Sequence, residues 1–510
     1  MKTPRLILFL FLFLLCSFSS WAQRKEKPVS EVIVQPYRYE APLEEGDDDF
    51  FVVSAKEEGV LLFREAQVRP QEGFRSWEFT LLDTTLNVKW KHLMALDINL
   101  ILNGYEYIDG KLYLLYQKSQ YKLYEYQFVV MDLYTRDTTQ HTFKNALPLV
   151  LTEFFVKKNV AILGGTVNYR SVVMLFDFAT NKQKVVPGFY NNRSELLQIK
   201  VDQYDSAFDV LVTERLANRY TLSTKTYSIQ GDLLQNIILE PKNGMHLLFG
   251  STTAFENDAR LIAGTYSPKP GNYSRGIFIS RINRKAEQDF TFINYADLKN
   301  FFTYMRAGRQ ERVKERIERR KIKGKRIRFN YRLMVHDVLK MDDTYVMLAE
   351  AYYPVYTNPS TLAYSGIANT SGLIFDGYRY THAVLIGFNE KGEVLWDNSF
   401  EINDIKTFTL RKFVQVALDG EKTVLLYVYD DVIRSKIVMG NEVLEGKTFN
   451  PVALKFESDE VKRDGSDLNG LEAWYDNTFY AYGVQRIKNL SQSGVELNRR
   501  VFYLNKVIYK

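Results

Sequence analysis

Short runs of β-branched and aromatic residues recur along the chain from Phe50 to the C-terminus, and turns rich in Gly, Asn, Asp or Lys separate them. Several runs are apolar at every position, as in Leu112–Tyr116 and Val424–Val428. A strand that is apolar on both faces is typical of a sheet packed between two neighbouring sheets. The pattern therefore predicts an all-β chain built from stacked sheets.

Two segments follow one template, in which an apolar strand, a polar turn and a second hydrophobic strand end in Trp. They run from Leu81 to Trp90 and from Gly387 to Trp396, and in both the turn residue, Asp83 or Asn389, stands seven positions before the Trp. Recurrence of such a unit indicates a repeat architecture, because each unit must stack on its neighbours to bury its faces. Looser copies of the strand and turn occur at Met131-Asp132, Phe176-Asp177 and Ser228–Gly231.

The strand runs group into about eight units. Their predicted starts are Phe50, Tyr105, Leu151, Ser206, Thr253, Arg332, Arg411 and Glu472. This spacing resembles that of the β-propeller superfamily, in which four-stranded blades surround a central channel. The segment from Gly387 to Trp396 is similar to quinoprotein-like repeats, but only two units carry the Trp, so the resemblance implies a superfamily and no particular member.

The resemblance implies a propeller of about eight blades over residues 50–510, with seven as the alternative. The last unit lacks a fourth strand, and Glu31–Val34 in the lead-in segment 23–49 would supply it if the ring closes as in other propellers. The similarity to quinoprotein-like repeats also makes a quinone-cofactor oxidoreductase a third hypothesis. It is the weakest of the three, because only two units carry the Trp and the chain has no cysteine pair. We expect no cofactor.

The first 22 residues have the composition of a secretory signal peptide. Lys2 and Arg5 precede an apolar run, Leu6–Leu15, and Ser20–Ala22 offers small residues for cleavage before Gln23. A retained membrane anchor is the alternative, but the run is shorter than the roughly 20 residues of a spanning helix. We therefore expect an exported protein, periplasmic, associated with the outer membrane or secreted, with no transmembrane helix in the mature chain. Its single cysteine would leave with the signal.

One segment has helical rather than strand periodicity. Apolar residues recur at three- and four-residue spacing at Tyr295, Leu298, Phe302, Met305, Val313 and Ile317. The pattern predicts an amphipathic helix from Asn294 to about Lys321, with Gly324 as a stop, inside a helical insertion that covers residues 294–328.

This insertion also concentrates the positive charge. Residues 306–328 hold twelve Lys or Arg and three Glu, a local charge of +9 within a chain of net charge +6. Without Lys2 and Arg5 the mature chain carries +4, so the rest of it carries −5. Three glutamates are too few to neutralise twelve positive side chains by ion pairing within the helix. We therefore predict that the helix binds an anionic partner through Arg309, Arg312, Arg316, Arg319, Arg320, Lys321 and Lys323.

Nucleic acid is a poor target for an exported protein. An anionic lipid or glycan surface, or an envelope protein, fits the charge better. The alternative is a solvated helix on the rim of the propeller, which is the usual role of a charged helix.

The residues typical of catalysis and metal binding form no recognisable motif. No G-x-S-x-G, P-loop or dinucleotide fingerprint is present. Asp459, Asp464 and Asp467 share a polar loop, but their spacing does not match a calcium loop, and a solvated hairpin is the stronger hypothesis. The histidines are dispersed at His92, His141, His246, His336 and His382, and we expect no metal site.

The leading hypothesis is a non-enzymatic binding or scaffold protein of the cell envelope. The alternative is an exported carbohydrate-active hydrolase or lyase, whose catalytic residues the sequence does not identify. An enzyme should bring acidic, basic and Tyr side chains together at one end of the channel, and a scaffold should line the channel with packing residues. A long polar insertion, Tyr352–Asp376, is a further candidate for a functional loop.

Overall fold

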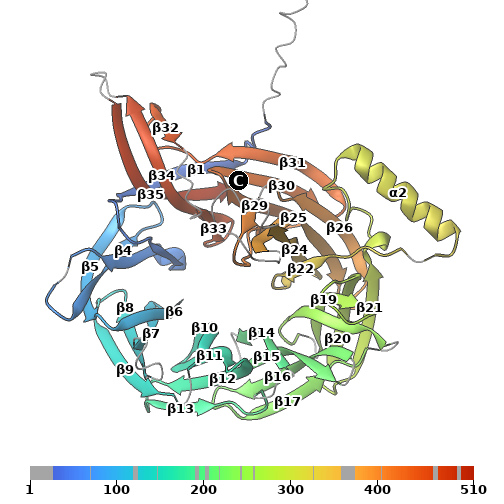
Figure 1. Ribbon diagram of the computed structural model, residues 1–510, viewed down its shortest axis with the longest axis horizontal. Helices are drawn as coiled ribbons and strands as arrows, with labels where there is room; N and C mark the ends of the chain where they lie inside the picture. The colour runs from blue at the N-terminus through green and yellow to red at the C-terminus, as the bar shows by residue number, and fades with distance from the viewer. Residues whose placement is uncertain are drawn as a thin grey trace, which may run out of the picture.

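In the computed structural model the described part of the chain is an eight-bladed β-propeller with one long helix (Figure 1). The structure describes residues 27–510 except 69, 119–124, 146–147, 190–193, 202–205, 217–218, 242–243, 257–258, 326, 358–373, 404, 463–468 and 491–495. The predicted signal peptide therefore lies outside the described residues. Within them, no helix is both long and apolar enough to cross a membrane.

Each blade is an antiparallel sheet whose first strand lies nearest the channel (Figure 1). Blades 1 to 4 are β2 (Phe51–Ser54), β3 (Val60–Ala66), β4 (Phe74–Leu82) and β5 (Val88–Asp97); β6 (Leu100–Ile108), β7 (Lys111–Lys118), β8 (Glu125–Asp132) and β9 (Thr138–Lys144); β10 (Val150–Lys157), β11 (Val160–Val167), β12 (Arg170–Asp177) and β13 (Lys182–Val185); and β14 (Ser194–Val201), β15 (Ala207–Leu216), β16 (Arg219–Ser228) and β17 (Leu233–Ile238).

Blades 5 to 8 complete the ring. They are β18 (His246–Thr252), β19 (Ala259–Ser267), β20 (Gly276–Asn283) and β21 (Gln288–Asn294); β22 (Arg332–Val335) with β23 (Leu339–Met341), β24 (Thr344–Thr357), β25 (Ile374–Asn389) and β26 (Val394–Glu401); β28 (Gln415–Asp419), β29 (Lys422–Tyr429), β30 (Val432–Met439) and β31 (Glu442–Pro451); and β33 (Asn469–Ala473), β34 (Thr478–Leu490), β35 (Glu496–Tyr509) and β1 (Ile33–Pro42). Two short strands, β27 (Lys406–Thr407) and β32 (Asp459–Lys462), pair with β25 and β34.

The strand and turn template marks the same hairpin in blades 1 and 6, the one that joins the third strand to the fourth. Asp83 Oδ1 accepts hydrogen bonds from the backbone N–H groups of Thr85 (2.8 Å) and Asn87 (2.9 Å). Asn389 Oδ1 accepts equivalent bonds from Lys391 and Glu393, both at 3.0 Å. A short side chain with an oxygen at this position satisfies backbone donors that the turn leaves unpaired.

Blade 5 contains the same turn, which sequence analysis did not detect. Asn283 Oδ1 accepts hydrogen bonds from Lys285 N (3.0 Å) and Glu287 N (2.9 Å). Ala286, three residues after Asn283, has a positive φ of 63°. Gly392 occupies the same position after Asn389 in blade 6 and has φ 76°. Phe290 stands where the template has Trp, but the hydrogen bonds of the turn are the same.

Gly387 and Trp396 of the template are cross-strand partners in blade 6. A Cβ atom at position 387 would lie 2.1 Å from Trp396 Cε2, so only glycine allows the indole to lie across the strand. We expect Gly387→Ala to lower the free energy of unfolding by about 2–3 kcal/mol, because the buried indole must move. Urea denaturation measures this loss. Gly446→Ala is the matched control, since no atom lies within 4 Å of its Cβ and it should change stability by less than about 0.5 kcal/mol.

The N-terminal strand closes the ring, as predicted. β1 pairs antiparallel with β35 from Ile33 opposite Tyr509 to Pro42 opposite Val501, so blade 8 contains strands from both ends of the chain (Figure 1). The strand begins two residues after the predicted start at Glu31 and is longer than predicted. Its continuation, residues 35–42, is polar in places because Arg38 and Glu40 enter an ion-pair network rather than the apolar core.

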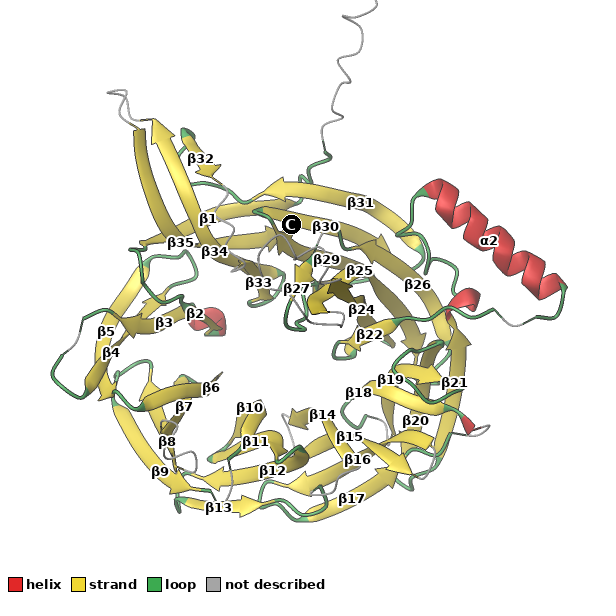
Figure 2. Cartoon of the chain, in the orientation of Figure 1, coloured by secondary structure: helices red, strands yellow, loops and turns green. Residues whose placement is uncertain are grey.

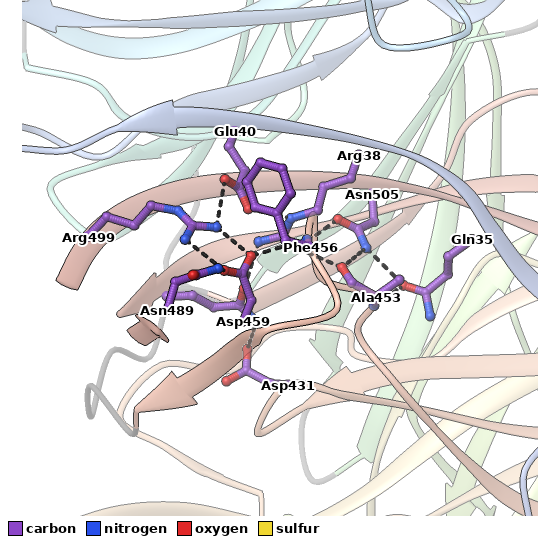
Figure 3. A network of polar contacts seen from close by, with 11 residues as sticks. Gln35, Arg38, Glu40, Asp431, Ala453, Phe456, Asp459, Asn489, Arg499 and Asn505 are labelled. Carbon is purple, nitrogen blue, oxygen red and sulfur yellow. Dashed lines mark hydrogen bonds and ion pairs between the residues drawn. The ribbon is translucent and has the colours of Figure 1, made fainter. Parts of the chain in front are cut away.

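Figure 3 shows that network between β1, β35 and the start of β32. Arg38 Nε lies 2.7 Å from Glu40 Oε1, and Arg499 Nη2 lies 3.3 Å from Glu40 Oε2 and 2.6 Å from Asp459 Oδ2. The Asp459 side chain is completely buried, and its hydrogen bond with Arg499 is the main influence lowering its pKa. Asp459 is therefore an ion-pair partner in the closing blade. Asp464 and Asp467, its predicted companions in the polar loop, lie outside the described residues.

Most predicted unit starts lie within a few residues of the blades, but three were placed clearly too late. Blade 2 begins at Leu100 rather than Tyr105, blade 4 at Ser194 rather than Ser206, and blade 5 at His246 rather than Thr253. In blade 4 the inner strand alternates polar residues such as Glu195, Gln198 and Lys200 with apolar ones, so it lacked the continuous apolar run that marked other strands.

The helix starts later than its periodicity predicts. α2 covers Ala307–Ile322, whereas residues 294–306 form a short 3₁₀ turn, η3 (Tyr295–Asp297), followed by irregular turns. The Asp397 carboxylate accepts hydrogen bonds from the backbone N–H groups of Lys299 (2.8 Å) and Asn300 (2.7 Å). In this segment the two backbone N–H groups bond to Asp397 of blade 6 instead of to carbonyl groups within a helix. The apolar positions of this segment are buried in turns instead.

Candidate functional site

α2 lies on the outside of the ring, beyond the outer strands of blades 5 and 6 (Figure 2). Ile317 is its only buried residue, and Val313 packs beside it. The turns before the helix, residues 294–306, are better buried than the helix. Tyr295 and Phe301 have no exposed surface, and Phe302 is 4% exposed. Hydrophobic contacts therefore attach this region through the turns before the helix, and most of α2 faces solvent.

All seven predicted binding residues are exposed in the structure. They are Arg309, Arg312, Arg316, Arg319, Arg320, Lys321 and Lys323. Two of them lie beside a carboxylate: Arg319 is 3.8 Å from Glu315 across one helical turn, and Lys321 is 3.0 Å from Asp297. Both of these pairs are more than half exposed, so each contributes little to stability. The surface of α2 remains strongly positive.

A cavity of about 600 Å³ lies between the first turn of α2 and blade 6, and we call it the N-terminal cavity. Arg306, Arg309 and Arg312 line it from the insertion, while Arg379 and Glu401 face it from β25 and β26. It thus has four guanidinium groups and one carboxylate. Arg306 and Arg379 were not among the predicted site residues, and Arg379 is separated from the helix by more than 50 positions in sequence, so only the fold brings it there.

A second cavity, of about 570 Å³, lies beneath the other end of α2, and we call it the C-terminal cavity. Its charged lining residues come from the hairpin between β19 and β20, from η3, and from the end of the insertion: Lys269, Arg275, Asp297, Lys321, Lys325 and Arg328. Burial lowers the pKa of Arg275, and the nearby positive charge of Arg328 lowers it further. Lys269 and Arg275 precede the basic segment in sequence and carried no signal of their own.

The channel is crossed by polar residues from blades that are not adjacent. Gln198 of blade 4 donates a 2.8 Å hydrogen bond from Nε2 to Asp337 Oδ1 in blade 6, and Lys412 Nζ lies 4.0 Å from the same oxygen. The charges of Asp337 and Lys412 both act on Glu153 of blade 3. Burial raises its pKa to about 7, against the attraction of Lys412 and with the repulsion of Asp337.

A second acidic group lies on blades 2 and 8. Glu472 accepts hydrogen bonds from Tyr480 (2.6 Å) and Tyr482 (2.8 Å). Burial raises the pKa of Glu106, on the inner strand β6, to about 7, although Lys56 opposes the shift. The inner strands therefore carry acidic groups as well as packing residues, and Asp337 and Glu472 are already bonded within the chain.

The pKa of Glu153 makes stability depend on pH. Because its native pKa of about 7 lies above the ordinary value of 4.5, its contribution is fully present below pH 4.5 and is lost as the pH rises through 7. We expect Glu153→Gln to be about 1 kcal/mol more stable than the wild type at pH 8, and the difference to vanish near pH 4.5. Urea denaturation between pH 4.5 and 8 tests this. Glu457→Gln, which removes an exposed carboxylate, is the control variant.

The remaining predicted candidates show structural roles or lie outside the described residues. His382 is fully buried and stacks on Tyr304 with ring centroids 3.6 Å apart, and burial lowers its pKa to about 3. Across the described part of the chain, no group of three or more His, Cys, Asp or Glu residues could hold a metal ion. The centre of the insertion Tyr352–Asp376, residues 358–373, lies outside the described residues.

Comparison with known proteins gives structural neighbours and no sequence relatives. No protein-family model matches the chain, and no curated protein matches it. The propeller domain of the trilobed protease from Pyrococcus furiosus aligns with a TM-score of 0.37 at 10% identity, over 79% of this chain and 95% of that one. The polysaccharide lyase Uly1 aligns with a TM-score of 0.39 at 8% identity, over 91% of this chain and 100% of that one. A likeness this distant transfers no functional residue to this chain.

Proposed function

We propose that the protein is an exported, non-enzymatic binding or scaffold protein of the cell envelope that contacts an anionic partner through α2. The observation that carries the proposal is the set of seven exposed Arg and Lys residues on and just after α2, within a segment whose local charge is +9. A charge this concentrated attracts anionic surfaces at distances up to about 10 Å at moderate salt.

The proposed location follows from the N-terminal sequence. A signal peptide over residues 1–22 would export the chain to the periplasm, the outer membrane or the exterior. The partners available there are anionic lipid or glycan surfaces and acidic envelope proteins. Mass spectrometry of the protein from envelope fractions tests this directly, since a chain that begins at Gln23 supports export and an intact N-terminus argues against it.

Binding itself is tested by retention on vesicles. Vesicles that contain an anionic lipid or lipopolysaccharide should retain the protein at low salt and release it as the salt approaches physiological concentration, because the contact is screened. Vesicles of neutral lipid are the control. Equal retention on both kinds of vesicle, or none on either, contradicts the proposed contact with an anionic surface.

The second candidate function is a carbohydrate-active hydrolase or lyase. The observation that favours it is that burial raises the pKa values of two carboxyl groups on inner strands of neighbouring blades, Glu106 and Glu153, to about 7, which suits proton transfer near neutral pH. Release of reducing ends or of unsaturated uronate from a panel of polysaccharides would show activity. Glu106→Gln and Glu153→Gln should then each reduce kcat by about 100-fold, and no product from any polysaccharide removes this candidate.

A further inference from the structure

The C-terminal cavity combines an excess of positive charge with little internal compensation. Five cationic side chains and one carboxylate line it, a net charge of +4. The carboxylate, Asp297, is paired with Lys321 at 3.0 Å. Arg275 and Arg328 lie close enough to repel one another, and in the described part of the chain neither has a carboxylate partner. Two guanidinium groups held together in this way form a site that an anion would stabilise.

The cavity is not only cationic. Met245, Phe292 and Ile327 supply an apolar wall, and Phe292 packs edge-on against Tyr266 with ring centroids 4.9 Å apart. Asn294 fixes its own orientation, since its side-chain oxygen accepts a 2.9 Å hydrogen bond from Ala296 N. Its amide nitrogen can therefore donate to a ligand, and the Asp297 carboxylate can accept from one.

These three features together select a class of ligand. An inorganic anion would satisfy the guanidinium groups and leave the apolar wall unused, and an acyl chain would bury cations without a partner. A sugar with acidic substituents offers anionic groups, hydroxyl groups and an apolar C–H face in one small molecule. A cavity of about 570 Å³ is within the size range of pockets that enclose small organic ligands.

We propose that the C-terminal cavity binds an anionic saccharide of about two sugar units, with its acidic groups on Arg275 and Arg328 and its C–H face against Phe292 and Ile327. Asn294 and Asp297 receive its hydroxyl groups. The inference rests on the proposed function, because it assigns the ligand that the anion-binding region recognises. The exposed arginines of α2 attract a surface that carries many anionic saccharides, and the cavity binds one disaccharide segment of that surface.

The first test is isothermal titration calorimetry with five probes: digalacturonate, a sulfated disaccharide, a glucosamine disaccharide bisphosphate, maltose and inorganic phosphate. The first two probes represent an acidic polysaccharide, and the third represents a phosphorylated glycolipid headgroup. The probe that binds most tightly therefore identifies which of these two supplies the saccharide. Maltose has the same size without charge and should not bind. Inorganic phosphate should bind at least about 10-fold more weakly than the best disaccharide, because it leaves the apolar wall exposed.

Variants locate the site. Arg275→Gln and Arg328→Gln should each weaken the best disaccharide by about 10- to 100-fold, since each removes charge-assisted hydrogen bonds. Neither should lower Tm, because each relieves a repulsion between cations. Lys285→Gln removes an exposed charge from the same blade outside the cavity and should change the affinity by less than about twofold. Unchanged affinity in both arginine variants, or equal binding of maltose, overturns the proposal.

The outcome is separable from that of the vesicle experiment. If disaccharides bind but vesicles do not retain the protein, the cavity is a saccharide site and the envelope-surface contact is wrong. If vesicles retain the protein and no disaccharide binds, the proposed function stands and the saccharide site is wrong.

Discussion

A chain that begins at Phe50 should melt at least about 5 °C below one that begins at Val29. Removing β1 deletes the fourth strand of blade 8 and exposes the backbone hydrogen-bonding groups of β35. It also removes buried Ile33, Ala41 and Leu43 from two core clusters. For a domain of this size each kcal/mol corresponds to roughly 1 °C in Tm, so the expected shift represents a loss of at least about 5 kcal/mol.

The polar partners of β1 enlarge this effect. Without Arg38 and Glu40, the network in Figure 3 loses the bond that Arg38 donates to Gln485 (2.8 Å) and the bond that Glu40 accepts from Arg499 (3.3 Å). Buried polar groups left without partners each cost about 1–3 kcal/mol.

Calorimetry of the two chains, with one that begins at Gln23 as reference, measures the effect. The chains that begin at Gln23 and Val29 should melt within about 2 °C of each other, because Ser30, which bonds to Asn450, is the first buried residue among those described, and the shorter chain loses only the hydrogen bond from Phe449 N to Pro28 O (2.8 Å) and the contact of Lys27 with the Phe449 ring. Equal melting temperatures for the chains that begin at Val29 and Phe50 contradict closure of the ring by β1.

Replacement of five arginines of α2 by Gln should abolish binding to anionic vesicles and leave the fold intact. These residues, Arg309, Arg312, Arg316, Arg319 and Arg320, are all exposed. Each cationic residue near an anionic lipid surface contributes about 1 kcal/mol, so the loss of five should reduce partitioning by more than about 100-fold. Tm should change by no more than about 2 °C, because exposed charges contribute little to stability and like charges oppose it.

The matched control replaces the same five arginines by Lys. This variant keeps the charge of α2 and should keep both the retention on vesicles and its salt dependence, if the contact is a general electrostatic one. Loss of retention in the Lys variant would indicate recognition by the guanidinium groups. If the Gln variant elutes with the wild type, α2 is a solvated helix on the rim and the proposed function is wrong.

Local sequence was sufficient to predict the blades. Strand composition and the turn side chains Asp83 and Asn389 act within a few residues, so they are visible without knowledge of the fold. Blade 5 shows the limit of this signal, because Asn283 and Ala286 form the same turn without Gly or Trp. Ring closure was predictable because a strand was missing at one end of the chain and present at the other.

The sequence by itself determined an all-β repeat fold and a cationic segment, since both depend on residue type and on spacing over short distances. Only the tertiary structure decided where the helix begins, because Asp397 of another blade takes the backbone bonds of Lys299 and Asn300. It also decided which residues surround the two cavities. Arg275 and Arg328 are more than 50 positions apart, and they meet because blade 5 and the end of the insertion pack against each other.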